Sequence, residues 1–152
     1  MAAVRLKNKG FALIELIAAA GILAGMAALL VPSYIGVRSY LYKMQAQRAA
    51  QQMAGDIAAL QQYSFYDVSG RSRLEMDKDK DGYRIYHGKD VFLKRNFGAA
   101  SGLYFSQHLN DLKFSQEGAP SQTLNYIIKS RHDKDISYWL QVQPVTGRVV
   151  FK

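Results

Sequence analysis

The sequence contains no cysteine among its 152 residues. A disulfide framework and a thiolate metal site are therefore excluded, and the folded part must be held together by packing alone. Hydrophobic residues make up 49% of the chain, which is normal for a folded protein and argues against disorder. The length suits one domain with one core.

The sequence also lacks recognisable catalytic motifs. It contains no G-x-S-x-G, no H-E-x-x-H and no glycine-rich phosphate loop. His87, His108 and His132 lie far apart in the sequence without metal-binding spacing, so we expect them at the surface or in turns. Trp139, within an expected strand, is expected in the core. We predict that the chain is not an enzyme and needs no organic cofactor.

Acidic residues are absent from the first ten positions, which carry Arg5, Lys7 and Lys9. The formal charge of the whole chain is +8, and removal of this basic head would lower it by three, to +5 (8 − 3 = 5). A basic balance favours contact with nucleic acid or anionic lipid but establishes neither.

A long apolar run follows the basic head. Residues 11 to 31 read FALIELIAAAGILAGMAALLV, with Glu15 as the single charge. This length matches the ~20 residues that a membrane-spanning helix needs. A secretory signal with Gly25 and Ala27 near its cleavage site is one alternative, and a plain signal anchor is another. Both leave Glu15 unexplained, although a carboxylate inside a membrane costs about 2.5–3.5 kcal/mol.

The stretch Lys9-Gly10-Phe11-Ala12-Leu13-Ile14-Glu15-Leu16 closely resembles the type IV prepilin signature. The resemblance implies that a prepilin peptidase/methyltransferase cuts between Gly10 and Phe11 on the cytoplasmic side and methylates the new amine of Phe11. Glu15 then stands at the fifth position of the mature chain, where this family carries its glutamate. The alanine after Phe11 departs from the usual threonine.

This resemblance gives Glu15 a role in assembly. The amine of Phe11, with an ordinary pKa near ~8, can pair with Glu15 of a neighbouring subunit. Because an unpaired buried carboxylate is costly, subunits packed with a wrong axial stagger are destabilised. Small residues would let such helices approach closely. Gly21, Gly25 and Pro32 weaken the helix locally, so we expect it to bend or melt there in a packed filament. The small residues are Ala18, Ala19, Ala20, Gly21, Ala24 and Gly25.

Helical periodicity continues beyond the apolar run. Apolar residues recur at steps of three and four and should form a stripe that carries a sheet. With the apolar run, this predicts a helix of roughly 53 residues, about 80 Å long at ~1.5 Å per residue. The stripe consists of Tyr34, Val37, Leu41, Met44, Met53, Ile57 and Leu60.

The C-terminal part alternates in the manner of half-buried antiparallel strands. We therefore predict an α+β, pilin-like fold with a long N-terminal helix packed on an antiparallel β-sheet body. The expected strands are 72–76, 82–87, 91–94, 103–105, 112–115, 124–130, 137–143 and 148–151. The expected parts are a leader (1–10), a transmembrane and filament-core helix (11–32), its amphipathic continuation (33–66) and the β-rich body (67–152).

The body more weakly resembles the H-type pseudopilins of type II secretion and related minor pilins. Because no disulfide-bounded loop can form, the resemblance favours a pseudopilin or minor pilin over a major adhesive pilin. The residues that carry it are Phe114, Gly118-Ala119-Pro120, Thr123 to Ile128, Val142, Pro144 and Gly147-Arg148-Val149.

A second candidate site lies at Asp77, Asp79 and Asp81, which match the opening of a calcium loop. Alternate carboxylates can converge on one Ca²⁺, but the position that requires glutamate in an EF-hand is Gly88. A solvated hairpin turn is the favoured interpretation, and an anchored calcium-binding module remains an alternative.

DNA is the third candidate ligand. A basic and aromatic patch would hold phosphates and bases, as in a competence minor pilin, but two acids interrupt it, so a solvated loop is favoured. The patch consists of Lys129, Arg131 and Lys134 with Tyr126 and Tyr138, and the interrupting acids are Asp133 and Asp135.

We therefore expect a structural subunit of a type IV pilus-like filament in a type II secretion, competence or pilus machinery. The resemblance implies a single-pass protein of the inner membrane whose body is extracytoplasmic and which enters a periplasmic or cell-surface filament. Its implied partners are the peptidase, other pilins or pseudopilins and an inner-membrane assembly platform. Which of these systems it serves is left open.

Overall fold

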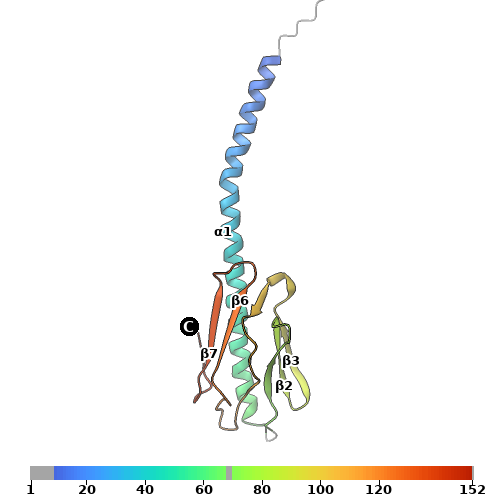
Figure 1. Ribbon diagram of the computed structural model, residues 1–152, viewed down its shortest axis with the longest axis vertical. Helices are drawn as coiled ribbons and strands as arrows, with labels where there is room; N and C mark the ends of the chain where they lie inside the picture. The colour runs from blue at the N-terminus through green and yellow to red at the C-terminus, as the bar shows by residue number, and fades with distance from the viewer. Residues whose placement is uncertain (1–8, 68–69, 152) are drawn as a thin grey trace, which may run out of the picture. The chain divides into compact units, whose positions relative to one another are not determined.

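The computed structural model describes the backbone of residues 9–67 and 70–151 (Figure 1), and their side chains except at 9–12, 30–33 and 99. The expected leader lies mostly outside these residues. The chain forms two compact units, Met1–Tyr40 and Leu41–Lys152.

Helix α1 (Lys9–Ser64) has 56 residues, so the predicted long N-terminal helix is confirmed. The described residues of the first unit belong to α1. This helix is long and apolar enough to cross a membrane. Gly21, Gly25 and Pro32 lie inside this continuous helix. The bending that we expect at these positions concerns a packed filament and stays a prediction.

The second unit places two antiparallel sheets beside the C-terminal part of α1 (Figure 1). One sheet has the strand order β3-β2-β1-β5 and the other the order β4-β6-β7-β8. The elements are β1 (Arg73–Met76), β2 (Gly82–His87), β3 (Asp90–Asn96), the 3₁₀ helix η1 (Ala99–Ser101), β4 (Leu103–Phe105), β5 (Leu112–Lys113), β6 (Leu124–Ser130), β7 (Ser137–Val142) and β8 (Val149–Phe151).

The predicted strands are found at or near their expected positions, and every pairing is antiparallel. The bounds of β2, β4 and β6 match the expected ranges, whereas β5 is shorter than expected. The strands form two sheets, where we expected a single sheet. Alternation shows which residues share a face of a strand, but it does not show which strands become neighbours.

The core lies between the sheets and one stripe of α1. Within the stripe, Met53, Ile57 and Leu60 are almost completely buried, as predicted. Ala46 and Ala50 extend the buried stripe toward the N-terminus. These two alanines leave room for the sheet side chains to approach the helix closely. The earlier part of the predicted stripe, including Tyr34, Val37 and Leu41, is exposed.

The prediction that Trp139 lies in the core is wrong, since its side chain is 47% exposed. Leu140 and Val142 point from β7 into the core, so the alternation of the strand turns Trp139 to the opposite face. There it pairs with Ile127 of β6. A tryptophan in a strand is often buried, but the alternation of side chains along β7 determines which face of the sheet Trp139 lies on.

Polar contacts fasten α1 to the first sheet. The hydroxyl of Tyr83 donates a hydrogen bond to Asp56 Oδ2 at 2.7 Å, and Arg95 Nε donates to the same oxygen at 3.1 Å. Burial raises the pKa of Tyr83 above its ordinary value, and the Asp56 carboxylate raises it further. The phenol therefore stays protonated and able to donate, which keeps the Asp56 carboxylate paired.

A second fastening ties the end of α1 to two loops. The side-chain amide of Gln61 donates to the carbonyl oxygens of Gly118 at 2.7 Å and Thr146 at 2.8 Å. Gly147 has a positive φ of 66°, and a Cβ there would lie 2.5 Å from Gln61 Nε2. Only glycine allows this close approach without a shift. The C-terminal hairpin is thus held against the helix.

Two buried tyrosines provide a matched pair of variants. Tyr83→Phe removes the hydrogen bond to Asp56 and should lower the free energy of unfolding by about 1.5–3 kcal/mol, the range for bonds to charged groups. Tyr126→Phe removes an equally buried hydroxyl to which no described residue bonds, so it should be neutral or stabilising. Denaturant unfolding of both full-length variants in detergent measures the difference. Equal losses would contradict the role assigned to the Asp56 contact.

Candidate functional site

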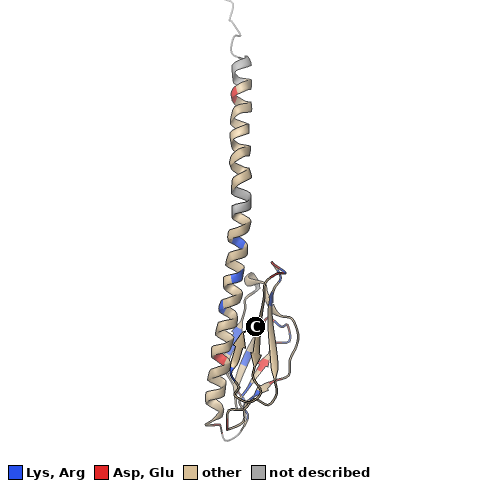
Figure 2. Cartoon of the chain, turned by 90° about the vertical axis from the view of Figure 1, so that its left-hand side faces the viewer, with Lys and Arg blue, Asp and Glu red and all other residues tan. Residues whose placement is uncertain are grey.

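The first candidate site is the N-terminal half of α1. Every described side chain from Leu13 to Leu29 is exposed, so no part of the chain that the structure describes covers this apolar surface. Glu15 is the single acid among them, and Figure 2 shows one acidic position in an otherwise uncharged stretch of α1. The neighbouring Leu16 is 71% exposed. A carboxylate thus lies within a surface that is suited to lipid or to other apolar helices.

The helix geometry places Glu15 between Phe11 and two alanines. Phe11 precedes it by four positions, and Ala18 and Ala19 follow by three and four, so these residues share one face. The structure describes Gly10 and Phe11 only as helical backbone. Cleavage between them and methylation of Phe11 therefore stay predictions.

The glycines of this half leave space for an approaching helix. A Cβ added at Gly21 or Gly25 would meet no atom of another residue within 4 Å, apart from the backbone of the helix itself. The surface at these two positions is therefore open, as close packing of a second helix requires.

The second candidate site is the turn between β1 and β2. Asp77 Oδ1 forms an ion pair with Arg84 Nε at 2.8 Å, and Asp81 accepts a hydrogen bond from Asn96 at 3.3 Å. The turn itself is closed by a backbone bond from Lys80 N to Asp77 O. These contacts are those of the favoured hairpin turn.

The predicted calcium ligands do not converge in this turn. Among the described residues, no group of three or more His, Asp or Glu side chains is arranged to hold a metal ion. Arg84 already neutralises Asp77, and Lys78 and Lys80 further lower the negative charge. Calcium binding by Asp77, Asp79 and Asp81 stays an untested hypothesis.

The residues of the alternative DNA patch do not gather on one exposed surface. Tyr126 is completely buried, and half-buried Tyr138 packs against the core, so these two rings cannot contribute to an exposed patch. Lys129 and Arg131 lie at the end of β6 and just beyond it, whereas Lys134 lies in the following turn. The two rings are unavailable because Tyr126 and Tyr138 occupy inward positions of their strands, and the favoured interpretation was a solvated loop.

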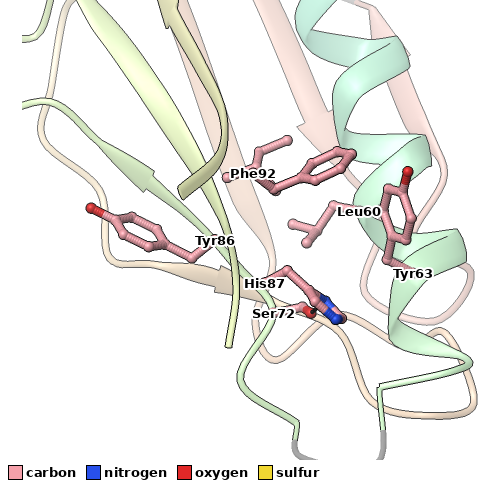
Figure 3. A pocket seen from close by; sticks show the side chains of 7 residues that line it. Leu60, Tyr63, Ser72, Tyr86, His87 and Phe92 are labelled. Atoms are coloured by element: carbon pink, nitrogen blue, oxygen red, sulfur yellow. Dashed lines mark hydrogen bonds between the residues drawn. The ribbon is translucent and has the colours of Figure 1, made fainter. Parts of the chain in front are cut away.

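A small pocket lies beside the C-terminal end of α1. Its volume is about 90 Å³, and Figure 3 shows the side chains of Leu60, Tyr63 and Phe92 around it. Ser72 and His87 lie side by side at its edge, while the ring of Tyr86 points away. The other lining residue is Ile85. The cavity is smaller than the ~150 Å³ that holds benzene, so it suits at most one small apolar group.

Ser72 and His87 at the polar edge of this pocket join Asp67, which is not among its lining residues, but the three are not in a catalytic order. Ser72 Oγ donates its proton to Asp67 Oδ2 at 2.5 Å and lies 3.1 Å from His87 Nδ1. Serine is therefore the middle member, whereas a hydrolytic triad places histidine between the other two. Asp67 also accepts the backbone N–H of Ser72 and that of Arg71. The arrangement stabilises the connection after α1 and does not activate a nucleophile.

All three histidines are exposed, as expected, and His132 also packs against α1. The ring of His132 stacks on Tyr42 with 4.7 Å between ring centroids. The imidazole also lies against Gly102, where a Cβ would be 2.6 Å from it. This stack fastens the turn between β6 and β7 to α1.

Comparison with known proteins adds one likeness. No protein-family model and no curated protein matches the chain. Among solved structures, the crystal structure of the type IV minor pilin FimU from Pseudomonas aeruginosa is similar, with 21% sequence identity and a TM-score of 0.48. The similar region covers 70% of this chain and 90% of that one. Any function of this chain has to be argued from its own residues and not from that likeness.

The contacts of the β1–β2 turn predict its response to calcium. Millimolar Ca²⁺ should leave the thermal unfolding midpoint of the full-length protein in detergent unchanged, because the carboxylate of Asp77 is already paired with Arg84. Differential scanning fluorimetry with Ca²⁺ and, as a control for ionic strength, with Na⁺ measures this. A rise of several degrees with Ca²⁺ that is lost in Asp79→Ala would establish the calcium site instead.

Proposed function

We propose that this chain is a minor pilin or pseudopilin, a structural subunit of a type IV pilus-like filament. The observation that carries the proposal is the uncovered apolar surface of α1, with Glu15 one helical turn after Phe11. The α+β architecture with a long N-terminal helix is the one that the sequence resemblance implied. The role is assembly, and catalysis has no part in it.

The apolar surface requires two successive environments. Burial of one large aliphatic side chain contributes about 1.5–3 kcal/mol, so a helix face with many of them is not stable in water. Before assembly the helix lies in the inner membrane, which its length and composition suit. After assembly it lies against the same helix of other pilins. The filament thus replaces lipid contacts with helix contacts of similar polarity.

Glu15 provides the specificity that apolar packing lacks. Apolar helices slide against one another at little cost, but a carboxylate in their interface requires a cation. Cleavage before Phe11 by the prepilin peptidase creates an amine at the end of the same helix. Pairing of this amine with Glu15 of a neighbouring subunit sets one axial stagger.

The second unit supports this role because it folds around its own core. All buried core residues lie between Ala46 and Val142. In the proposed filament this body stays outside the cytoplasm and faces partner subunits or cargo, while an inner-membrane platform drives assembly. The same subunit chemistry serves secretion, competence and pilus machineries.

Replacement of Glu15 tests the proposal in the natural host. Glu15→Gln should be processed normally yet enter filaments at least tenfold less, since an amide keeps the size of the side chain but cannot neutralise the amine. The ratio of filament-associated to membrane-bound subunit, measured by quantitative immunoblotting after shearing and pulldown with partner pilins, reports this. Glu117→Gln, which changes an exposed acid of the body, is the matched control. Normal incorporation of Glu15→Gln would refute the pairing mechanism.

A further inference from the structure

Acidic residues are missing from a long stretch of α1. Between Glu15 and Asp56 the sequence contains no aspartate or glutamate, and its cations are Arg38, Lys43 and Arg48. Figure 2 shows the same pattern along the middle of the helix, with basic positions and no acidic one. Because a solvated helix usually carries charges of both signs on its polar surface, this one-sided charge suits contact with an anionic surface.

Tyrosines accompany the change from an apolar to a basic surface. Tyr34 and Tyr40 follow the apolar run, and both side chains are exposed. A tyrosine combines an apolar ring with a polar hydroxyl, so exposed tyrosines next to a membrane-spanning segment are typical of the headgroup layer. Within a few residues the helix thus passes from a surface that suits lipid chains to one that suits lipid headgroups.

The turn between β6 and β7, residues 131–136, adds cations where α1 enters the second unit. The ring of His132 stacks on Tyr42, and the backbone N–H of Arg131 donates a hydrogen bond to the carbonyl oxygen of Gly102 at 2.8 Å. These contacts hold the turn beside the first helical turns of this unit. Three exposed cations lie here and are called the basic end of the second unit: Lys43, Arg131 and Lys134.

Two acids in the same turn offset part of this charge. The carboxylate of Asp133 accepts the backbone N–H of Asp135 at 3.1 Å, so Asp133 is engaged within the turn. The connection 97–102, which lines a groove together with Gln45 and Arg48, carries no charge. Helix residues 41–52 and the segments 97–102 and 131–136 together contain four cations and two acids, a net charge of +2 (4 − 2 = 2).

The opposite end of the second unit provides an internal comparison. There, Gln61 bonds to the two connections that contain Gly118 and Thr146. Helix residues 53–64 and the connections 65–72, 114–123 and 143–148 contain two cations and three acids, a net charge of −1 (2 − 3 = −1). An excess of cations is therefore found at the end from which α1 continues into its apolar half, and not at the other.

The length of helix between the apolar run and the basic end matches the reach of a charged membrane surface. Lys43 follows Val31, the last residue of the apolar run, by twelve positions (43 − 31 = 12) in the continuous helix α1. At ~1.5 Å per residue this is a rise of about 18 Å, of which the headgroup layer fills roughly 5–7 Å. The remaining distance of about 12 Å is close to the Debye length of ~8–10 Å, and long basic side chains shorten it further.

We propose that the basic end of the second unit binds the headgroups of anionic phospholipids while the subunit is in the membrane. Lys43, Arg131 and Lys134 attract the lipid phosphates, and Tyr34 and Tyr40 lie in the headgroup layer. Attraction of cations next to a membrane span by anionic lipid is a general effect that salt weakens. The inference rests on the proposed function, because it concerns the membrane-bound stage of the subunit. Extraction into a filament then has to break lipid contacts of the body as well as those of the apolar helix.

Energy transfer from the single tryptophan measures the lipid preference, because Trp139 lies in β7 shortly after the basic turn. The full-length protein is reconstituted in phosphatidylcholine bilayers with a trace of pyrene-labelled phosphatidylglycerol or, in a parallel sample, of pyrene-labelled phosphatidylcholine. At roughly 50 mM salt, transfer should report about a threefold or greater enrichment of the anionic probe over the neutral probe. The enrichment should fall by at least about half at roughly 500 mM salt, since salt screens the attraction.

Two triple variants separate the basic end from general attraction by net charge. The first removes the three cations of the basic end and should abolish the enrichment; it combines Lys43→Gln, Arg131→Gln and Lys134→Gln. The second removes the same charge from exposed lysines elsewhere in the unit and should keep the enrichment; it combines Lys78→Gln, Lys89→Gln and Lys113→Gln. Both variants keep the basic residues of the leader, so the leader contributes equally to each.

Thermal unfolding shows whether the variants are folded. If the first is not, Lys43→Gln with Lys134→Gln makes the same comparison and keeps Arg131, whose guanidinium lies 5.5 Å from the centroid of the Tyr104 ring. Absence of enrichment in the unmodified protein, enrichment that persists without the basic end, or equal losses in the two triple variants would each overturn the proposal. A normal start at Phe11 and filament entry that depends on Glu15 would, in that case, leave the proposed function intact.

Discussion

An apolar helix segment that no described residue of the chain covers is the constraint on which this protein depends. The described side chains between Leu13 and Leu29 are all exposed, and a carboxylate interrupts them at Glu15. Lipid can cover the aliphatic groups, but it cannot satisfy the acid. Other helices can do both if one of them brings a cation to the right height. The need for a partner therefore follows from the covalent structure of this segment.

The body shows the opposite arrangement, because polar contacts within the chain fasten its sheets and loops to α1. Asp56 joins α1 to the first sheet through Tyr83 and Arg95, and Gln61 joins the end of α1 to two loops. These contacts are hydrogen bonds of defined direction, so they hold the sheets at fixed positions on the helix. The second unit can thus present a constant surface whatever surrounds the apolar segment.

The long helix and most strands could be predicted from sequence because both have a periodic apolar pattern. The buried stripe at Met53, Ile57 and Leu60 is an example, and so is β6. The position of Trp139 was predicted wrongly, because the prediction relied on the residue type and not on the alternation of side chains along β7. The division into two sheets and the Asp56–Tyr83 contact could not be predicted, because they join residues distant in sequence without a local signal. At the candidate sites, Glu15 was apparent as a lone acid, whereas the ion pair of Asp77 with Arg84 depends on the β1–β2 hairpin and had no sequence signal.

The central claim is that Glu15 meets an amine created by cleavage before Phe11. Tandem mass spectrometry of the mature protein, isolated from membranes and filaments of its natural host, tests this claim most directly. The account predicts an N-terminal peptide that begins with N-methylated Phe11. An intact leader in the mature protein, or a start beyond Ala27 as a secretory signal would produce, would contradict it.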